Sequence, residues 1–449
     1  ADGGVATAPW QVLRTCARTG PERVVWEGLR RNQLKGRVRE DLFARYFRDF
    51  TDPTVGLRAR MTWFFMNWFA TPIGEIDNDY LMMAHQYDTV WAGALGNYRT
   101  LALHMFNDPA LRASLDQLTE VECGTVPVEN FAREYFERFT VGLEAHNEGD
   151  VKRLAKALMN CPEDVETPNL DLTTPGLIFA DVNETVWTLT EAEQRAVVDR
   201  VLDFRLAPAE PPAAAQFMCA KLYAELAVPP EAAGPLSLAL QPRAVVDCAE
   251  HFYAHGYEMR AALEFILKDR EHFKEQLGRK LRWPVELIYG PWADFNLSLT
   301  QASGKTWTGN VGQRPFEPPD VSGFDLDTVW TLDRVSKAHE FLTTWAVRRE
   351  PHSWVEKAHF ANITAARAAL APYQVPGASD LYSFATAICD LDLFVDQEGA
   401  VGAHLLNITC LFDSSCTSIA DAHRTQTQRW RVWRANIDLT LTNVCQFLS

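Results

Sequence analysis

The chain has 449 residues, of which 47% are hydrophobic and 23% are charged, so it is long enough to bury one large core or two of ordinary size. It carries 43 Lys and Arg residues against 59 Asp and Glu residues, a formal net charge of −16. This acidic balance speaks against a broad cationic surface, and we therefore expect no nucleic-acid partner. No apolar run reaches the roughly 18 residues that span a bilayer, so we expect no membrane-spanning segment.

Apolar residues recur at helical spacing along most of the chain, and this periodicity predicts an all-α fold, a large multi-helix globular domain with at most a few short strands. Helices are expected at residues 36–50, 54–70, 79–92, 97–118, 128–143, 148–160, 190–204, 211–226, 242–255, 257–269, 270–282, 284–295, 327–346, 352–372, 379–395 and 415–447. Residues 161–187 interrupt the series, and Leu177 to Phe179 have the composition of a short strand. Residues 300–325 are rich in Gly and Pro and are expected to form a loop, because Pro315, Pro318 and Pro319 cannot lie inside a helix.

Residues 128–142 form the most informative stretch, since a helix there would carry one polar row and one aromatic row. The polar row consists of Glu129, Asn130, Arg133, Glu134, Glu137 and Thr140. Helical spacing alone favours a solvated amphipathic face. The alternative is a partly buried charge network of Glu129, Arg133 and Glu137 that lines a cleft, which requires every charge to be paired.

Three further blocks accompany this one in the chain. They comprise Phe65, Asn67, Trp68 and Phe69; then Ala94 to Arg99 with Asp108, Pro109 and Ala110; and then Val311, Gly312, Gln313, Pro315, Phe316, Pro318, Pro319, Val321, Gly323 and Phe324, with Trp330 and Arg334 beyond. As an ordered set, the four blocks resemble the domain-of-unknown-function family 1800, over about residues 40–335. The resemblance implies an exported protein of a mainly bacterial family that has no settled activity.

The chain departs from the family pattern at several polar positions. Trp68 replaces a histidine, Trp91 and Gly93 replace an arginine and a histidine, Val128 replaces an asparagine, and Phe324 replaces a tryptophan. We expect the polar chemistry of the family pattern to be weakened or redirected here. The pattern fades after Arg334, which suggests a family-like helical domain at residues 1–345 and a C-terminal helical extension at residues 346–449.

The nine cysteines include no Cys-x-x-Cys pair, so a zinc ribbon or a thioredoxin-type motif is not expected. Cys410 and Cys416 are close enough in sequence to close a small disulfide loop. Glycosylation sequons begin at Asn183, Asn296, Asn362 and Asn407. The first residues read like the terminus left by signal cleavage, and together with the implied family this predicts a secreted, extracellular, periplasmic or organelle-lumenal location.

Two motifs imitate known sites. The run Ser303 to Thr306 resembles the end of a phosphate-binding loop, but Leu299 stands where that loop requires glycine. His251 and His255 have the spacing of metal ligands on a helix, but Phe252 stands where the zinc-protease motif has glutamate. We expect neither a cofactor nor a metal.

Two functions fit these observations, and the first is favoured. It is a non-catalytic, exported structural or interaction subunit with a protein partner in an extracellular or lumenal assembly. The alternative is a secreted hydrolase or metal-assisted enzyme that acts on an extracellular polymer, in which paired carboxylates serve as acid and base. Its site of carboxylates and an arginine would lie where the polar row meets the predicted loop at residues 300–325, close to Gln313 and Asp320.

Overall fold

The computed structural model describes residues 23–117, 126–159, 173–180, 190–226, 242–268, 283–286, 288–289, 301–329, 331, 333–334 and 337. These residues form helices joined by loops, and their pairing as β-structure is limited to one isolated antiparallel bridge between Asn97 and Glu258. The predicted all-α fold is therefore confirmed. Within the described ranges, no helix combines the length and the apolar character that a membrane crossing requires.

The first part of the chain supplies helices α2 (Arg23–Thr51), α3 (Gly56–Trp68), α4 (Tyr80–Gly93), α5 (Tyr98–Phe106) and α6 (Pro109–Ser114), with short 3-10 helices at Pro53–Val55 and Ile73–Ile76. The middle part supplies α7 (Asn130–Glu134), a π-helix (Tyr135–Thr140), α8 (Glu148–Leu158), α9 (Glu191–Asp203), α10 (Ala213–Leu226), α11 (Arg243–Ala254) and α12 (Met259–Lys268). Helices α15 (Gln301–Asn310) and α16 (Leu326–Val329) follow.

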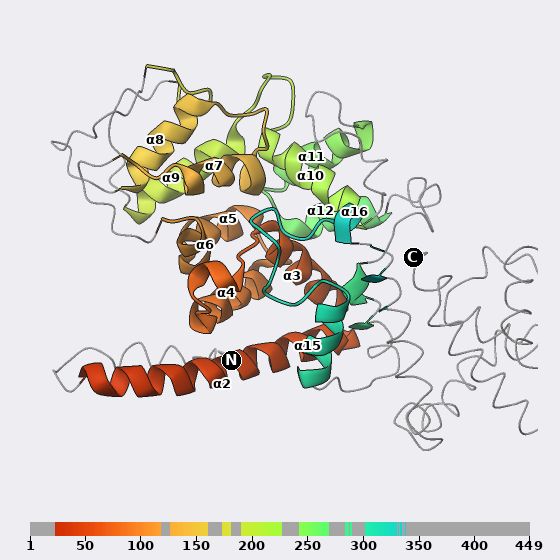
Figure 1. Cartoon of the computed structure of the whole chain (residues 1–449). Helices are drawn as coiled ribbons and strands as arrows, with labels where there is room; N and C mark the ends of the chain where they lie inside the picture. Colours follow the sequence, from red (N-terminus) through yellow and green to blue (C-terminus); the bar gives the residue numbers. More distant parts are fainter. Residues whose placement is uncertain are drawn as a thin grey trace, which may run out of the picture.

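The helices are arranged in layers (Figure 1). Helix α2 lies along one side, α3 to α6 lie above it, and α7 to α12 form the layer beyond. Helix α15 returns from late in the sequence and contacts α2. Helix α3 lies between two apolar cores, because Phe65 belongs to the core shared with α5 and α10, whereas Trp63 belongs to the core shared with α2 and α4.

Side-chain caps fix where several helices begin. Asn97 accepts from the backbone N–H of Thr100 at the start of α5, and Asp108 accepts from Leu111 N–H at the start of α6. Pro109 occupies the first turn of α6, where its missing N–H costs no hydrogen bond. The single helix predicted at residues 97–118 is therefore wrong, because this cap and this proline divide it in two.

The loop predicted at residues 300–325 is wrong over its first part, where α15 is helical. Gly304 packs against the ring of Phe47 on α2, so closely that a Cβ atom there would lie 2.6 Å from the Phe47 Cζ atom. The glycine that reads as a helix breaker is thus a packing requirement of the contact between α15 and α2. Residues beyond Asn310 are not helical until α16, as the prolines predict.

The short strand predicted at Leu177 to Phe179 is also wrong, because these residues form a turn. The buried carboxylate of Asp150 in α8 accepts from Leu177 N–H at 2.9 Å and from Phe179 N–H at 3.0 Å. A side chain therefore takes the backbone hydrogen bonds that a neighbouring strand would have supplied.

Other predictions concern residues outside the described ranges. They are the extension at 346–449, the sequons at Asn183, Asn296, Asn362 and Asn407, the cysteines Cys410 and Cys416, and the helices expected at 270–282, 352–372, 379–395 and 415–447.

Candidate functional site

Arg133 is the centre of the polar row, and its ion pairs hold α7 to α8. Its Nη1 and Nη2 atoms donate to Glu148 Oε1 at 2.6 Å and Oε2 at 3.0 Å, and Nη2 also donates to Glu129 at 3.1 Å. Glu137 Oε1 lies 3.7 Å from Nη1. The hydrogen bond that Arg133 donates to Glu148 raises the pKa of Arg133, and the same bond lowers the pKa of Glu148. The two carboxylates expected in the charge network, Glu129 and Glu137, thus share the guanidinium of Arg133.

The other residues of the polar row do not share one face, because the α-helix changes to a π-helix at Tyr135. Glu134 pairs with Arg138 at 2.9 Å, and burial raises the pKa of Glu134 against the opposing charge of Arg138. Asn130 is exposed, whereas Thr140 is buried and donates to the Tyr135 carbonyl at 2.6 Å. Thr140 therefore belongs to the core and not to a polar face.

The loop of Gln313 and Asp320 has other partners. The buried Gln313 accepts from Val285 N–H through Oε1 at 2.9 Å, and the exposed Asp320 accepts from Ser322 N–H at 2.7 Å. The hydrogen bonds and ion pairs of the polar row go to Glu148, Arg138 and His146. Of the polar row, Glu137 lines a cavity that is also lined by Val321 and Ser322, the two residues that follow Asp320.

That cavity has a volume of about 720 Å³ and is walled by α3, the π-helix, α10 and the loop 321–325. Its aromatic wall consists of Phe64, Trp68, Phe217, Trp283 and Phe324. Its charged lining consists of Glu137, Arg138, Glu144, Lys221, Glu225 and Asp325. Leu143 on its edge is 73% exposed, so the cavity opens to solvent.

Asn67 fixes the loop that closes one side of the cavity. It donates to the Phe324 carbonyl at 3.0 Å and accepts from Phe324 N–H at 2.6 Å. Gly323 adopts φ +79°, and a Cβ atom there would clash with the backbone of Asn67. The Asn67 block and the Gly323 block, which are far apart in sequence, thus form one wall.

The inner carboxylates of the cavity are engaged by other side chains. Glu225 is 7% exposed, accepts from the Trp283 indole N–H and pairs with Arg60 at 3.1 Å. Glu137 lies 3.7 Å from His146 Nε2, in addition to its contact with Arg133. Both acids therefore hold elements together, which offsets the cost of placing them at the wall.

Lys221 differs from these acids. Its Nζ atom lies 5.6 Å from the centre of the Phe217 ring, and within the described ranges it forms no ion pair. Burial lowers the pKa of the Lys221 amine, Arg138 adds to this effect, and Asp325 opposes it. A half-buried amine without a paired anion is costly, and it is free to meet a ligand.

Lys221, Glu225 and Trp283 line the cavity but are not among the residues predicted from the sequence. The available signal was that Lys221 and Glu225 are charged residues one helical turn apart in the otherwise apolar segment Ala213–Leu226. Two residues that depart from the family pattern, Trp68 and Phe324, also line this cavity.

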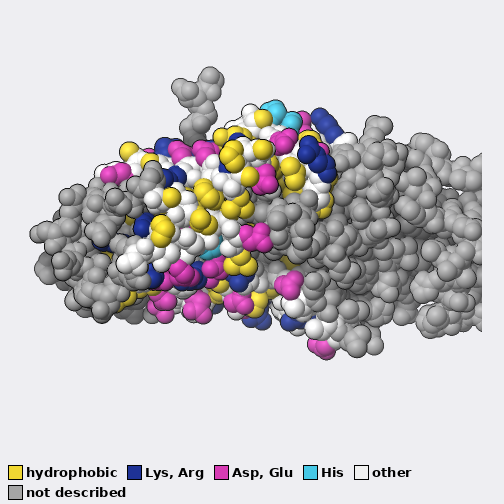
Figure 2. Space-filling view, turned by 90° about the horizontal axis from the view of Figure 1, so that it is seen from above, with side chains coloured by type: hydrophobic (Ala, Val, Ile, Leu, Met, Phe, Trp, Pro, Cys, Tyr) yellow, Lys and Arg dark blue, Asp and Glu magenta, His cyan; other side chains and the backbone are white. Residues whose placement is uncertain are grey.

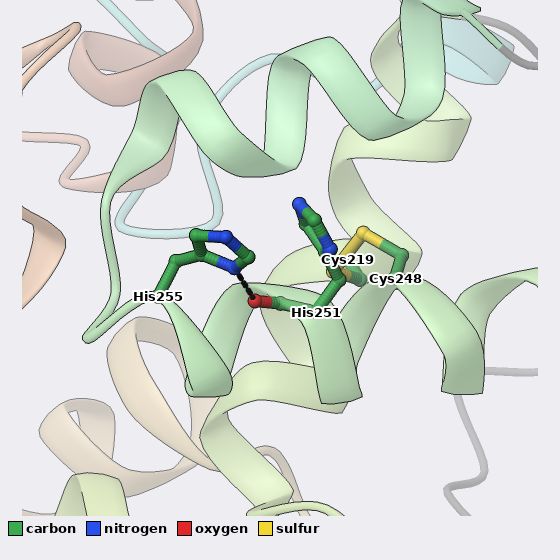
Figure 3. Close-up of a disulfide and its surroundings, with 4 residues drawn as sticks. All are labelled: Cys219, Cys248, His251 and His255. Atoms are coloured by element: carbon green, nitrogen blue, oxygen red, sulfur yellow. Dashed lines mark hydrogen bonds between the residues drawn. A yellow bond between two sulfur atoms is a disulfide. The ribbon is translucent and has the colours of Figure 1, made fainter.

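The histidine pair lies elsewhere, beside a disulfide (Figure 3). Cys219 in α10 and Cys248 in α11 are joined, with their Cα atoms 6.1 Å apart. His255 Nδ1 lies 2.8 Å from the His251 carbonyl, and the two rings are 4.1 Å apart between centres. Burial and the neighbouring His255 lower the pKa of His251. In the part of the chain that the structure describes, no three His, Cys, Asp or Glu side chains group as a metal site.

The fold is that of an all-α protein with a solvent-accessible cavity between helices. The family model of the protein of unknown function DUF1800 matches residues 7–409, and the chain belongs to that family. The match continues past residue 345, and the division at that residue stays a prediction. No curated protein and no solved structure matches the chain.

Proposed function

We propose that the protein is an exported, non-catalytic interaction subunit of an extracellular or lumenal assembly, and that its cavity holds a group of the partner or ligand. Trp68 carries this proposal. The family pattern has a histidine at this position, and here an indole forms part of the cavity wall with its N–H donated to the Phe139 carbonyl at 3.1 Å. A group that could transfer protons is thus replaced by an apolar surface whose donor is already used.

The engagement of the inner acids supports the same proposal. Glu225 pairs with Arg60 of α3, and Glu137 lies 3.7 Å from Arg133, one turn earlier, and 3.7 Å from His146. General acid and base catalysis needs carboxyl groups whose environments separate their pKa values and leave a proton free to transfer. Acids that bind Arg60 and Arg133 serve the architecture of the wall.

The disulfide between Cys219 and Cys248 supports export, because disulfides persist in oxidising compartments. It crosslinks α10, which carries the cavity residues Phe217 and Lys221, to α11. The side of the cavity formed by α10 is therefore reinforced by a bond typical of exported proteins.

Binding in the cavity can be tested with N-phenyl-1-naphthylamine, a neutral dye whose fluorescence rises in apolar surroundings. We expect the wild-type protein to bind it, and Ala224→Trp, which fills the cavity, to weaken binding by about tenfold or more. Ala261→Trp on α12 is the matched control, since Ala261 does not line the cavity and is also half-buried. Equal binding by the wild type and Ala224→Trp would contradict a binding role for this cavity.

A second candidate is hydrolysis of an extracellular polymer, favoured by the presence of Glu137, Glu144, Glu225 and Asp325 around one cavity. Hydrolysis is distinguished from binding alone by the release of product. Incubation with a panel of soluble polysaccharides should release no new reducing ends if the role is binding alone. Release that Glu144→Gln abolishes, with dye binding retained, would replace the binding role by catalysis.

A further inference from the structure

We propose that the cavity selects an organic monoanion, a ligand with an apolar or ring-bearing body and one carboxylate or similar acidic group, and that Lys221 contacts the acidic group. This inference rests on the proposed binding function and names its ligand class. It is carried by the arrangement of the charged side chains around the aromatic wall.

Among the described residues around the cavity, Lys221 is a cation with no carboxylate within ion-pair distance. Arg138 also lines the cavity, but its Nε atom is paired with Glu134 at 2.9 Å. The Lys221 amine lies against the Phe217 ring and has no carboxylate partner within the described ranges. An anionic group placed there would gain a charge-assisted hydrogen bond in partly desolvated surroundings.

The acids of the cavity limit how much negative charge a ligand can carry. Glu137 lies 3.7 Å from Arg133, and Glu225 pairs with Arg60 at 3.1 Å, so arginines offset their charges. Glu144 and Asp325 also line the cavity, and both are exposed. A single anionic group can meet Lys221, whereas a polyanion would bring further charges close to these two exposed acids.

The aromatic wall of the cavity favours an apolar or ring-bearing body for the ligand. Trp68 and Phe217 contact each other edge to face, with ring centres 5.3 Å apart, and Phe324 stacks on Trp63 at 5.8 Å. The rings are therefore held in position before a ligand arrives. Preorganised apolar walls favour a rigid apolar or ring-bearing body, because little side-chain entropy is lost on binding.

The test compares two dyes that share one aromatic body. The anion is 8-anilinonaphthalene-1-sulfonate, and the neutral analogue is N-phenyl-1-naphthylamine, which lacks the sulfonate. We expect the full-length wild-type protein to bind the anion more tightly by about 10- to 100-fold, the effect of one charge-assisted hydrogen bond. Lys221→Met should remove this preference while the neutral dye still binds, and Lys221→Arg should retain the preference.

Binding of the neutral dye shows that the Lys221→Met cavity is still folded, and Lys268→Met on the exposed end of α12 controls for loss of one positive charge. Equal affinities of the wild type for the two dyes, or an unchanged preference in Lys221→Met, would overturn the inference. If neutral-dye binding remained sensitive to Ala224→Trp in that case, the proposed binding function would still stand. Failure of both dyes to bind would instead overturn the binding function itself.

Discussion

Arg133 and Glu148 form a two-pronged ion pair that joins α7 to the first turn of α8, with nitrogen–oxygen distances of 2.6 Å and 3.0 Å. Glu148 also lies at the positive end of the α8 dipole. The polar row of residues 128–142 therefore acts mainly between two helices, and only Glu137 of that row reaches the cavity.

This ion pair predicts a pH-dependent contribution to stability. Because Arg133 lowers the pKa of Glu148, the contribution is present above the ordinary glutamate pKa and is lost as the pH falls through the lower pKa of the folded state. In a double-mutant cycle of Arg133→Met and Glu148→Gln, we expect a coupling of about 0.5–1 kcal/mol at pH 7, since the pair is partly solvated. Chemical unfolding at pH 7 and at pH 3 measures it. A coupling that is equal at both pH values would contradict this assignment.

Lys221 predicts a variant that is more stable than the wild type. Burial lowers its pKa, so the folded chain binds fewer protons than the unfolded chain between the folded-state pKa and the ordinary lysine pKa. Stability therefore falls as the pH drops through that window, and the penalty is complete below the folded-state pKa. Lys221→Met should raise the unfolding free energy at pH 7 by about 0.5–2 kcal/mol.

The gain from Lys221→Met should shrink as the pH approaches the ordinary lysine pKa. Lys268→Met is the matched control, because Lys268 is exposed and pairs with Glu264 on its own helix. Thermal unfolding between pH 7 and pH 10 separates the two variants. A destabilised Lys221→Met at pH 7, with Lys268→Met unchanged, would show that the amine has a stabilising partner and is not held for a ligand.

Asp150 predicts a large structural effect far from the cavity. Its buried carboxylate accepts from Asn147, Leu177 and Phe179 N–H groups, at 3.1, 2.9 and 3.0 Å. Asp150→Asn turns one acceptor into a donor that faces these donors, so we expect a loss of about 2–4 kcal/mol in unfolding free energy. Asp247→Asn, which alters an exposed pair with Arg243, should cost about 0.5 kcal/mol or less. Equal effects of the two variants in urea unfolding would refute the role of Asp150.

The all-α class follows from residue patterns alone, because the periodic burial of apolar residues is a local property. Helix starts with a cap and a following acid, such as Thr190 and Glu193 at α9, are similarly local. The helical state of Gln301–Asn310 is not local, because Gly304 is required by the ring of Phe47, which is more than 250 residues away in the chain. Low helix propensity there is overridden by tertiary packing.

The candidate site shows the same division. Asn67, Glu137 and Phe324 belong to the motif blocks, and all three line the cavity. Lys221 belongs to no block, and although Lys221 and Glu225 stand out in a mostly apolar helix, the sequence does not show that they face a cavity. A regular α-helix would place Thr140 on the polar row. The wider π-helix instead directs its side chain into the core.

The disulfide yields a prediction that links stability to the cavity. Cys219 and Cys248 are both fully buried and lie 29 residues apart, so the bond closes a loop whose entropy loss in the unfolded chain is worth about 3–4 kcal/mol. Replacing both residues with alanine should lower the unfolding free energy by at least this amount, since the two side chains also pack in the core. Unfolding of the wild type under reducing conditions supplies the comparison without a change of sequence.

Because α10 also carries Phe217 and Lys221, the same loss should reach the binding site. We expect reduced protein to bind 8-anilinonaphthalene-1-sulfonate more weakly at temperatures near its lowered unfolding midpoint, and with unchanged affinity well below it. The reason is that the disulfide acts mainly by lowering the entropy of the unfolded chain. The position of Lys221 in the folded protein is set by the packing of α10 in the core. A weaker affinity at every temperature would instead show that the crosslink positions the cavity wall directly.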